Sequence, residues 1–149
     1  MPRRIRLSFV NEDVSVEAEM LEDEAPRTCQ AVWDALPLVE EGIHAVYSGS
    51  EIAYFLSEDM VIPPENLTSC TLPGDICYYR LESGLMHGLL DGITELCWFD
   101  GRDGRPNMPD GPVSVNLFAR MVGDASEFFE VCYRIRREGM KRVRIEQVV

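Results

Sequence analysis

Strict alternation of apolar and polar residues marks the first twenty positions of the chain. Ile5, Leu7 and Phe9 alternate with polar residues before a turn, and an equally regular second run ends at Met20. A period of two on both arms predicts a β-hairpin over residues 4–20 with one buried and one solvated face. The solvated face has arginines on one arm and glutamates on the other, so we expect these charges to pair across the strands.

The same reading predicts six further strands and two helices. The strands are expected at residues 43–47, 51–56, 75–81, 93–99, 113–122 and 142–148. Apolar residues spaced three and four apart predict helices at 23–36 and 124–138, with Asp124 and Glu127 at capping-box spacing in the second. Glycines and prolines between 100 and 112 predict a long surface loop.

These elements place the chain in the mainly β class. About eight short strands and two helices occur without the strand–helix–strand alternation of a doubly wound sheet. We therefore predict a closed antiparallel β-barrel whose two ends are covered by the helices. A length of 149 residues suits a single domain spanning residues 1–149.

Charge and cysteine content limit the classes of binding partner and the cellular compartment that we expect. With 14 basic and 26 acidic residues the formal net charge is −12, which disfavours binding to nucleic acid or to an anionic membrane. Five cysteines form no CxxC pair, and neither a leader-like segment nor a membrane-length apolar run is visible. Reduced thiols in a cytoplasmic protein are the expectation.

Sequence motifs for cofactor or metal chemistry are absent. The two histidines, His44 and His87, lack HxH or HExxH spacing, and no GxSxG or phosphate-binding loop occurs. We expect no metal and no cofactor. The roles of His87 and of the loop from Asp100 to Pro112 stay open.

Several motifs, taken in order, resemble the cyclophilin family. APRT at residues 25–28 opens a helix as VPKT does in cyclophilins, IHAVYSG at 43–49 is similar to FHRIIPG, and DG at 110–111 precedes FARMV at 118–122. The chain looks closer still to a bacterial cyclophilin-like family of unassigned activity. The resemblance implies a cyclophilin-like barrel.

Residue by residue, the resemblance argues against prolyl isomerase activity. The catalytic arginine position of cyclophilins corresponds to Ala45, and the pocket tryptophan to Met108. The pocket phenylalanine, methionine and glutamine correspond to Ser50, Glu51 and Ala53, and the histidine after DG to Val113 or Val115. Both the apolar proline slot and its cation are therefore replaced.

The same correspondence suggests a pocket on the outer face of the barrel. Its candidate residues are His44, Tyr47, Ser50, Glu51, Tyr54 and Met108. If Glu51 is desolvated, it would bind a cation or an amide N–H, or act as a general base. The alternative is that Glu51 lies in a turn and is exposed to solvent.

Three functions follow from these observations. The leading one is binding of a small molecule or short peptide without isomerase activity. The second is an enzyme that uses Glu51 or a nearby histidine as general acid or base. The third is a homo-oligomeric interaction module built on aromatic residues such as Trp98 or Tyr79.

Overall fold

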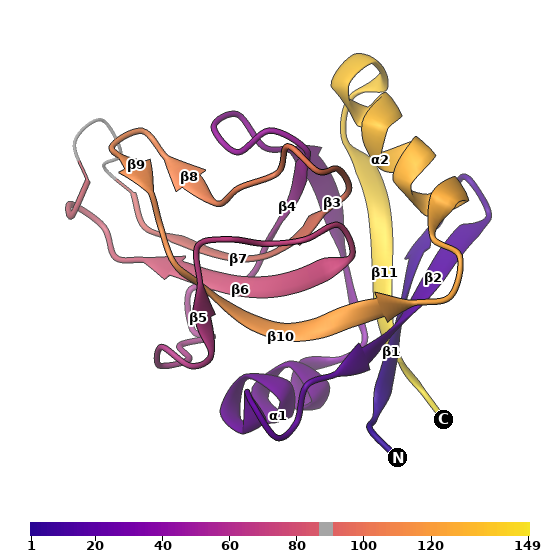
Figure 1. Cartoon of the computed structure of the whole chain (residues 1–149), viewed down its shortest axis with the longest axis horizontal. Helices are drawn as coiled ribbons and strands as arrows, with labels where there is room; N and C mark the ends of the chain where they lie inside the picture. Colours follow the sequence, from indigo (N-terminus) through magenta and orange to yellow (C-terminus); the bar gives the residue numbers. More distant parts are fainter. Residues whose placement is uncertain (87–90) are drawn as a thin grey trace.

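Eight antiparallel strands close into a barrel in the computed structural model, which describes residues 1–86 and 91–149 (Figure 1). Around the barrel the order is β2 (Val14–Met20), β1 (Arg4–Phe9), β11 (Lys141–Val148), β3 (Leu38–His44), β4 (Glu51–Phe55), β7 (Ile93–Phe99), β6 (Asp75–Leu81) and β10 (Val115–Val122). Pairing of β10 with β2 completes the circle. The predicted mainly β fold with a closed barrel is confirmed.

Short strands are present in addition to the eight of the barrel. Strand β5 (Leu67–Thr68) pairs with the start of β10, and β8 (Asn107–Met108) pairs with β9 (Gly111–Pro112) in a small separate hairpin. The segment from 100 to 112, expected to be a loop, thus contains this hairpin.

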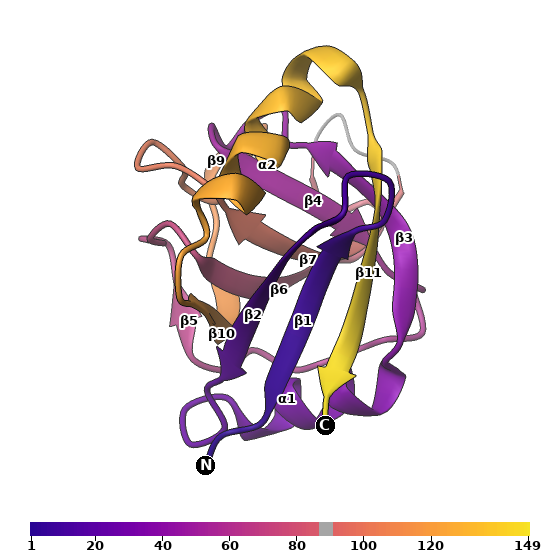
Figure 2. The ribbon, with the colours of Figure 1, turned by 90° about the vertical axis from the view of Figure 1, so that its right-hand side faces the viewer.

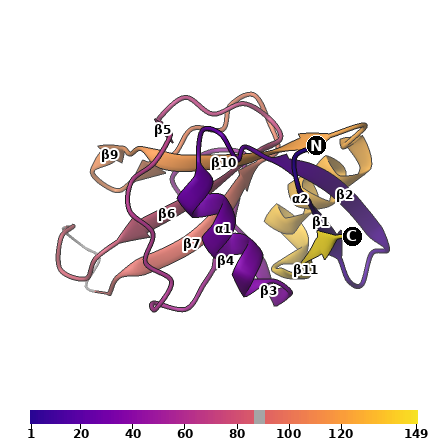
Figure 3. The ribbon, with the colours of Figure 1, turned by 90° about the horizontal axis from the view of Figure 1, so that it is seen from below.

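Two helices lie at opposite ends of the barrel (Figure 2). Helix α1 (Pro26–Ala35) covers the lower opening, as the view from below shows (Figure 3). Helix α2 (Ser126–Glu138) lies at the other end, where Phe128 packs against Phe9 at 4.7 Å between ring centroids. The helices therefore shield the barrel interior from water.

The interior is filled by side chains from every strand of the barrel. Trp98 and Tyr54 lie at its centre and are both fully buried, with ring centroids 5.7 Å apart. The other large buried side chains that fill this interior are Phe9, Tyr78, Phe118, Phe128, Ile5, Leu7, Met20, Ile52 and Ile76. Alternation along each strand sends these residues inward and their neighbours outward.

The first hairpin agrees with its sequence pattern. In the register of β1 and β2, Arg4 lies opposite Glu19 and Arg6 opposite Glu17. Arg6 Nη2 approaches Glu17 Oε2 at 3.1 Å, and Arg4 contacts both glutamates at 3.3 Å. The expected pairing of charges is confirmed.

Strand β3 is the element that the hydrophobic pattern placed wrongly. It spans Leu38–His44 instead of 43–47, although it includes the consecutive acids Glu40 and Glu41. Hydrogen bonding to β11 on one side and to β4 on the other holds it in the sheet. Pairing with two neighbours therefore outweighs the poor strand propensity of the acids.

The second helix also starts later than the pattern indicates. Because its first residue is Ser126, Asp124 lies before the N-cap, and its Oδ1 accepts a hydrogen bond from Ser126 N at 3.0 Å. The predicted capping box with Glu127 does not form. At the other end Gly139, with φ of 86°, ends the helix as expected.

None of the described helices is both long enough and apolar enough to span a lipid bilayer.

Candidate functional site

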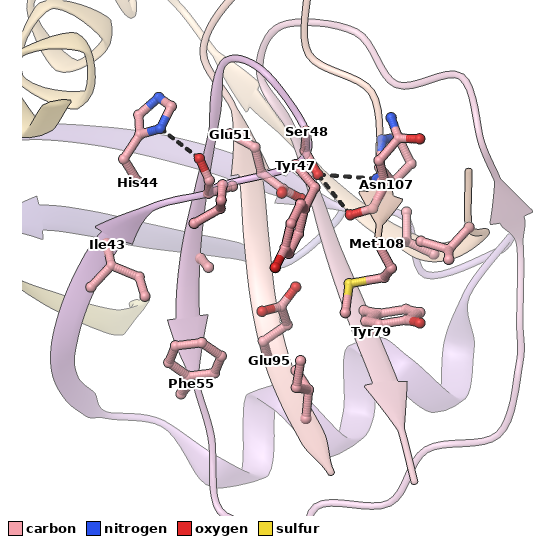
Figure 4. A pocket seen from close by; sticks show the side chains of 17 residues that line it. Ile43, His44, Tyr47, Ser48, Glu51, Phe55, Tyr79, Glu95, Asn107 and Met108 are labelled. Carbon is pink, nitrogen blue, oxygen red and sulfur yellow. Dashed lines mark hydrogen bonds between the residues drawn. The ribbon is translucent and has the colours of Figure 1, made fainter. Parts of the chain in front are cut away.

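A pocket of about 120 Å³ lies on the outer face of the barrel (Figure 4). Its floor is the outward side of β4, β7, β6 and the start of β10, and its roof is formed by the turn after β3 and by residues 106–108. The lining residues are Ile43, His44, Ala45, Val46, Tyr47, Ser48, Glu51, Ala53, Phe55, Tyr79, Ile93, Glu95, Pro106, Asn107, Met108, Val113 and Val115.

Strand parity explains which side chains reach this pocket. Along β4, Ile52 and Tyr54 point into the barrel, so Glu51, Ala53 and Phe55 point outward. In the register with β7, Ala53 lies opposite Cys97, and Phe55 lies opposite Glu95. The small alanine between two larger outward residues leaves the hollow in the floor.

One serine joins the two segments of the roof. The Ser48 hydroxyl accepts a hydrogen bond from Asn107 N at 3.0 Å and donates one to Asn107 O at 3.1 Å. Ser48 O also accepts a bond from Arg105 N at 2.9 Å. The loop after β7 is therefore fastened to the turn before β4, and it lies over the pocket.

The turn itself depends on a glycine. Gly49 has a φ of +71°, and a Cβ atom there would lie 2.6 Å from the carbonyl oxygen of Asp103. Any other residue would meet both a strained backbone and a collision with the neighbouring loop. Gly49 therefore allows the close approach on which the roof depends.

Glu51 is a buried carboxyl at the upper end of the pocket. Its exposed fraction is only 4%, and burial raises its pKa to about 7. The Cys97 thiol and the Ser48 hydroxyl act in the opposite direction, while the nearby Asp100 raises the pKa further. The interpretation of Glu51 as a solvated turn residue is wrong, because strand β4 begins there and the roof covers it.

Glu95 is a second buried carboxyl in the same pocket. Its exposed fraction is 9%, and burial, followed by the repulsion from Glu51, raises its pKa to about 8. Figure 4 shows its carboxyl group pointing into the pocket. Among residues 1–86 and 91–149, the pocket lining includes no lysine or arginine to neutralise either acid.

These two carboxyls also form the one potential metal-ligand group found in the described part of the chain. One carboxylate oxygen of Glu51, one of Glu95 and the Sγ atom of Cys97 all lie within 4.8 Å of one another. The motif search concerned histidine spacing, so it did not reveal this group. Carboxylate and thiolate ligands together are compatible with a zinc-type ion.

His44 lies at the edge of the pocket, away from the two carboxyls (Figure 4). Its Nδ1 lies 2.8 Å from Ala45 O, and because a carbonyl only accepts, Nδ1 carries the proton. Burial lowers the pKa of the ring, so the imidazole is neutral near pH 7. The buried Nε2 atom has no hydrogen-bond partner within residues 1–86 and 91–149.

The structure brings together four of the six predicted site residues: His44, Tyr47, Glu51 and Met108 line the pocket. Tyr54 does not, because it has inward parity on β4; its hydroxyl donates to Val143 O at 3.0 Å. Ser50 does not either, because its Oγ atom accepts a bond from Arg136 Nη2 at 2.9 Å.

The structure also adds residues that sequence reasoning missed. Glu95 is the most important, and its signal was a lone acid inside the otherwise apolar strand ITELCWF. Tyr79 and Phe55 belong to the pocket too. His87, whose role was left open, lies outside the described residues.

The aromatic pairs follow the expected alternation. Tyr78 and Trp98 point into the core, whereas Tyr79 points to the pocket and Phe99 to a smaller outer cluster with Cys77, Cys97, Val115 and Leu117. Trp98 is fully buried, so the suggestion that it builds an oligomer interface is wrong.

Comparison with protein families gives one match, to the family described as protein of unknown function (DUF3830), over residues 7–147. The chain belongs to this family. A comparison with curated proteins found no match. Because the DUF3830 family is described as having no known function, membership of it does not indicate what this protein does.

Solved structures similar to this DUF3830 protein support the barrel. McbB in complex with tryptophan has a TM-score of 0.71 at 14% identity over 95% of this chain, which spans 44% of the McbB chain. The hypothetical protein AF2241 from Archaeoglobus fulgidus has a TM-score of 0.58 at 22% identity, covering 99% of this chain and 95% of its own. The Mimivirus cyclophilin has a TM-score of 0.61 at 9% identity, with 98% and 87% covered. The cyclophilin-like fold is therefore shown.

Proposed function

We propose that this protein binds a small organic molecule in the outer pocket and has no prolyl isomerase activity. The observation that carries the proposal is the pocket itself, in which apolar walls enclose two buried carboxyls. Binding sites for small molecules combine mostly apolar walls with a few polar groups that fix orientation. Around its mouth Val46, Tyr47 and Phe55 are 83%, 51% and 45% exposed, so apolar surface is presented to an incoming ligand.

A structural neighbour gives additional support. McbB was solved in complex with tryptophan, a single amino acid. A barrel of this kind is therefore compatible with small-molecule binding, although the likeness in sequence is too low to transfer the ligand. Short peptides are the alternative class of ligand, and the binding experiment below includes them.

Loss of isomerase activity follows from the side chains at the pocket. Ala45, Glu51, Ala53, Met108 and Val113 all line it, at positions where the cyclophilin resemblance implies other residues. An alanine in place of the arginine leaves nothing to polarise a prolyl amide, and an acid replaces part of the apolar slot. A standard prolyl-peptide isomerisation assay is expected to show the uncatalysed rate, and a rate far above it would overturn this part of the proposal.

A thermal-shift screen against metabolites and short peptides tests the binding function. A ligand at one hundred times its dissociation constant stabilises a fold by about 2.7 kcal/mol, which is readily measured as a rise in melting temperature. Ala53→Leu would fill the hollow in the floor and is expected to abolish the shift. Ser15→Leu, which adds the same side chain at an exposed position on β2, is the matched control and should keep it.

Two results would contradict the proposal. One is a screen without any hit on well-folded protein, and the other is a set of hits that all survive Ala53→Leu. Hits confined to peptides would place the ligand in the peptide class.

A second candidate function is enzymatic acid–base chemistry. It is favoured by one observation, the two adjacent carboxyls whose pKa values are raised to about 7 and about 8. Such a pair near neutrality suits proton transfer to and from a bound substrate. Each hit should be incubated with the protein and followed by mass spectrometry; conversion that is lost in Glu51→Gln would support an enzyme, and unchanged hits would leave binding alone.

Cytoplasmic location, lack of affinity for nucleic acid and assembly into a homo-oligomer stay predictions. Light scattering of the purified protein tests the last of these.

A further inference from the structure

We propose that the pocket selects small organic cations, and that Glu51 and Glu95 together bind the cationic nitrogen and give up a bound proton as it enters. The inference rests on the proposed binding function and names the class of ligand. Its basis is the placement of two acids in a pocket that otherwise offers apolar surface.

The first argument is the missing partner of Glu95. This carboxyl is about nine-tenths buried and points into the pocket, and within residues 1–86 and 91–149 it makes no hydrogen bond and no ion pair. A buried carboxylate without a cation or donors is strongly disfavoured, so it either holds a proton or receives a positively charged partner. Glu51, which is 4% exposed, is the buried acid next to it, and one carboxylate oxygen of Glu51 lies within 4.8 Å of one of Glu95.

The second argument concerns the groups that face the pair from each neighbouring element. Tyr47 faces it from the turn after β3, Tyr79 from β6, Cys97 from β7 with Cys77 beside it, and Asp100 from the loop behind Glu51. His44, the last residue of β3, lies at the edge of the pocket. None of these carries a positive charge near neutral pH, since burial keeps the His44 ring neutral. The compensating charge therefore has to come from a proton or from a ligand.

The third argument is the shape and surface of the cavity. A cavity of about 150 Å³ in another protein holds benzene, so the present volume of about 120 Å³ suits a group close to that size. Ile43, Phe55 and Val113 offer apolar contact to the body of the ligand. Tyr47 and Tyr79 also line the cavity, and aromatic faces attract cations.

A bare metal ion fits these features less well. It would be held by Glu51, Glu95 and the fully buried Cys97 thiol, and it would leave the apolar walls without a role. An organic cation uses the carboxyls and the walls together. Cys97 therefore separates the two possibilities, because only the metal needs its sulfur.

Binding exchanges a proton for the ligand cation. The ammonium group of the ligand enters with its proton, the carboxyl pair loses the proton that it held, and that proton passes to the buffer. Affinity for an amine should therefore rise with pH, because the pair is increasingly deprotonated while an aliphatic amine stays charged.

The test uses three probes of one shape: benzylamine, benzyl alcohol and benzoate. We expect benzylamine to bind at least about tenfold tighter than benzyl alcohol at about pH 8, because charge-assisted hydrogen bonds replace neutral ones. Its affinity should fall about tenfold or more at about pH 6, as one carboxyl takes up its proton. Calorimetry in two buffers of different ionisation enthalpy should detect the released proton.

Two substitutions test whether the buried carboxyl pair is responsible for binding the cation. Glu95→Gln should weaken benzylamine about tenfold or more and change benzyl alcohol less than about twofold, since only the charged contact is lost. Glu130→Gln removes the same charge from an exposed position on α2 and should leave both probes unchanged, which excludes general attraction to an acidic protein. Unfolding curves of each variant confirm that it is folded.

Three outcomes would overturn the inference. If benzyl alcohol or benzoate binds as tightly as benzylamine, in a manner blocked by Ala53→Leu, the pocket binds small molecules but does not select cations. If Zn²⁺ alone binds and Cys97→Ser abolishes that binding while benzylamine shows none, the site is a metal site. If none of the three probes binds while the metabolite screen gives hits blocked by Ala53→Leu, the proposed function stands and the cation class is wrong; if the screen is empty as well, both fail.

Discussion

Strands β4 and β7 contribute alternate residues to two regions, the interior of the barrel and the pocket on its outer face. These two regions differ in burial and in charge. On the inner face Ile52, Tyr54, Leu96 and Trp98 are fully buried, and the Tyr54 hydroxyl donates to a backbone carbonyl. On the outer face the same two strands present carboxyls that have no cationic partner in the described part of the chain. The Trp98 Nε1 atom has no hydrogen-bond partner among residues 1–86 and 91–149, so the two faces differ in charge: the inner side of these two strands carries no acid, and the outer side carries Glu51 and Glu95.

Within each of these strands, the inner side chains stabilise the fold and the outer side chains form the pocket. Side chains that fill the interior contribute to the free energy of unfolding, and their loss leaves a cavity. The outer carboxyls instead oppose folding whenever they are charged, because no cationic neighbour within residues 1–86 and 91–149 compensates them. Truncation of an inner side chain should therefore destabilise the protein, whereas neutralisation of an outer carboxyl should stabilise it near pH 8.

The largest contrast is expected between Trp98→Ala and Phe55→Ala. Removing the fully buried indole should destabilise the protein by about 3–5 kcal/mol, as large-to-small core substitutions do. Phe55 is 45% exposed at the pocket mouth, so its removal should cost less than about 1 kcal/mol. Urea unfolding of both variants measures the difference, and similar losses would show that the outer face also belongs to the core.

The pH dependence of stability should reveal the carboxyl pair. In the folded chain the pKa values of Glu51 and Glu95 are raised to about 7 and about 8 from an ordinary 4.5, so the folded state holds protons that the unfolded state has lost. Their contribution to stability is therefore present below about pH 4.5 and is lost as pH rises toward about pH 8.

Glu95→Gln should remove part of that loss. At about pH 8 the variant should be more stable than the wild type by roughly 4 kcal/mol, at about 1.4 kcal/mol per unit of pKa shift, and at about pH 5 the two should differ by less than about 1 kcal/mol. Urea unfolding at both pH values provides the measurement. Equal stability at pH 8 would mean that the acid has a partner or is solvated.

A smaller contrast separates two tyrosines on opposite faces. Tyr54→Phe removes the buried hydrogen bond to Val143 O, which should cost about 1 kcal/mol. Tyr79→Phe, on the pocket side, should change stability by less than about 0.5 kcal/mol. Thermal unfolding of the pair is the measurement, and equal losses would argue against the division between the faces.

The fold was predictable from the sequence because alternation is strong wherever one face meets the barrel interior. Residues 4–20 show it plainly, and their register agrees with the pattern. Strand β3 was not predictable in the same way, because its acids at 40 and 41 break the alternation and its place depends on pairing with β11 and β4. Such pairing joins residues that are distant in the sequence.

The pocket was predictable only in part, for a related reason. Glu51 was found through the cyclophilin resemblance, and parity counted from it along β4 would have excluded Tyr54. Glu95 was missed because no motif includes it, although a single acid within an apolar strand is an unusual pattern. Its meeting with Glu51 depends on the side-by-side placement of β4 and β7.

The position of β11 has a consequence for biosynthesis. This last strand lies between β1 and β3, pairing with both, so it joins the first hairpin to the rest of the wall. A nascent chain that still lacks residues 141–148 has a gap there, and its apolar interior faces solvent. Closure therefore waits until residues 141–148 have been synthesised and depends on contacts between segments far apart in the sequence, which favours slow folding and exposure to chaperones before the barrel closes.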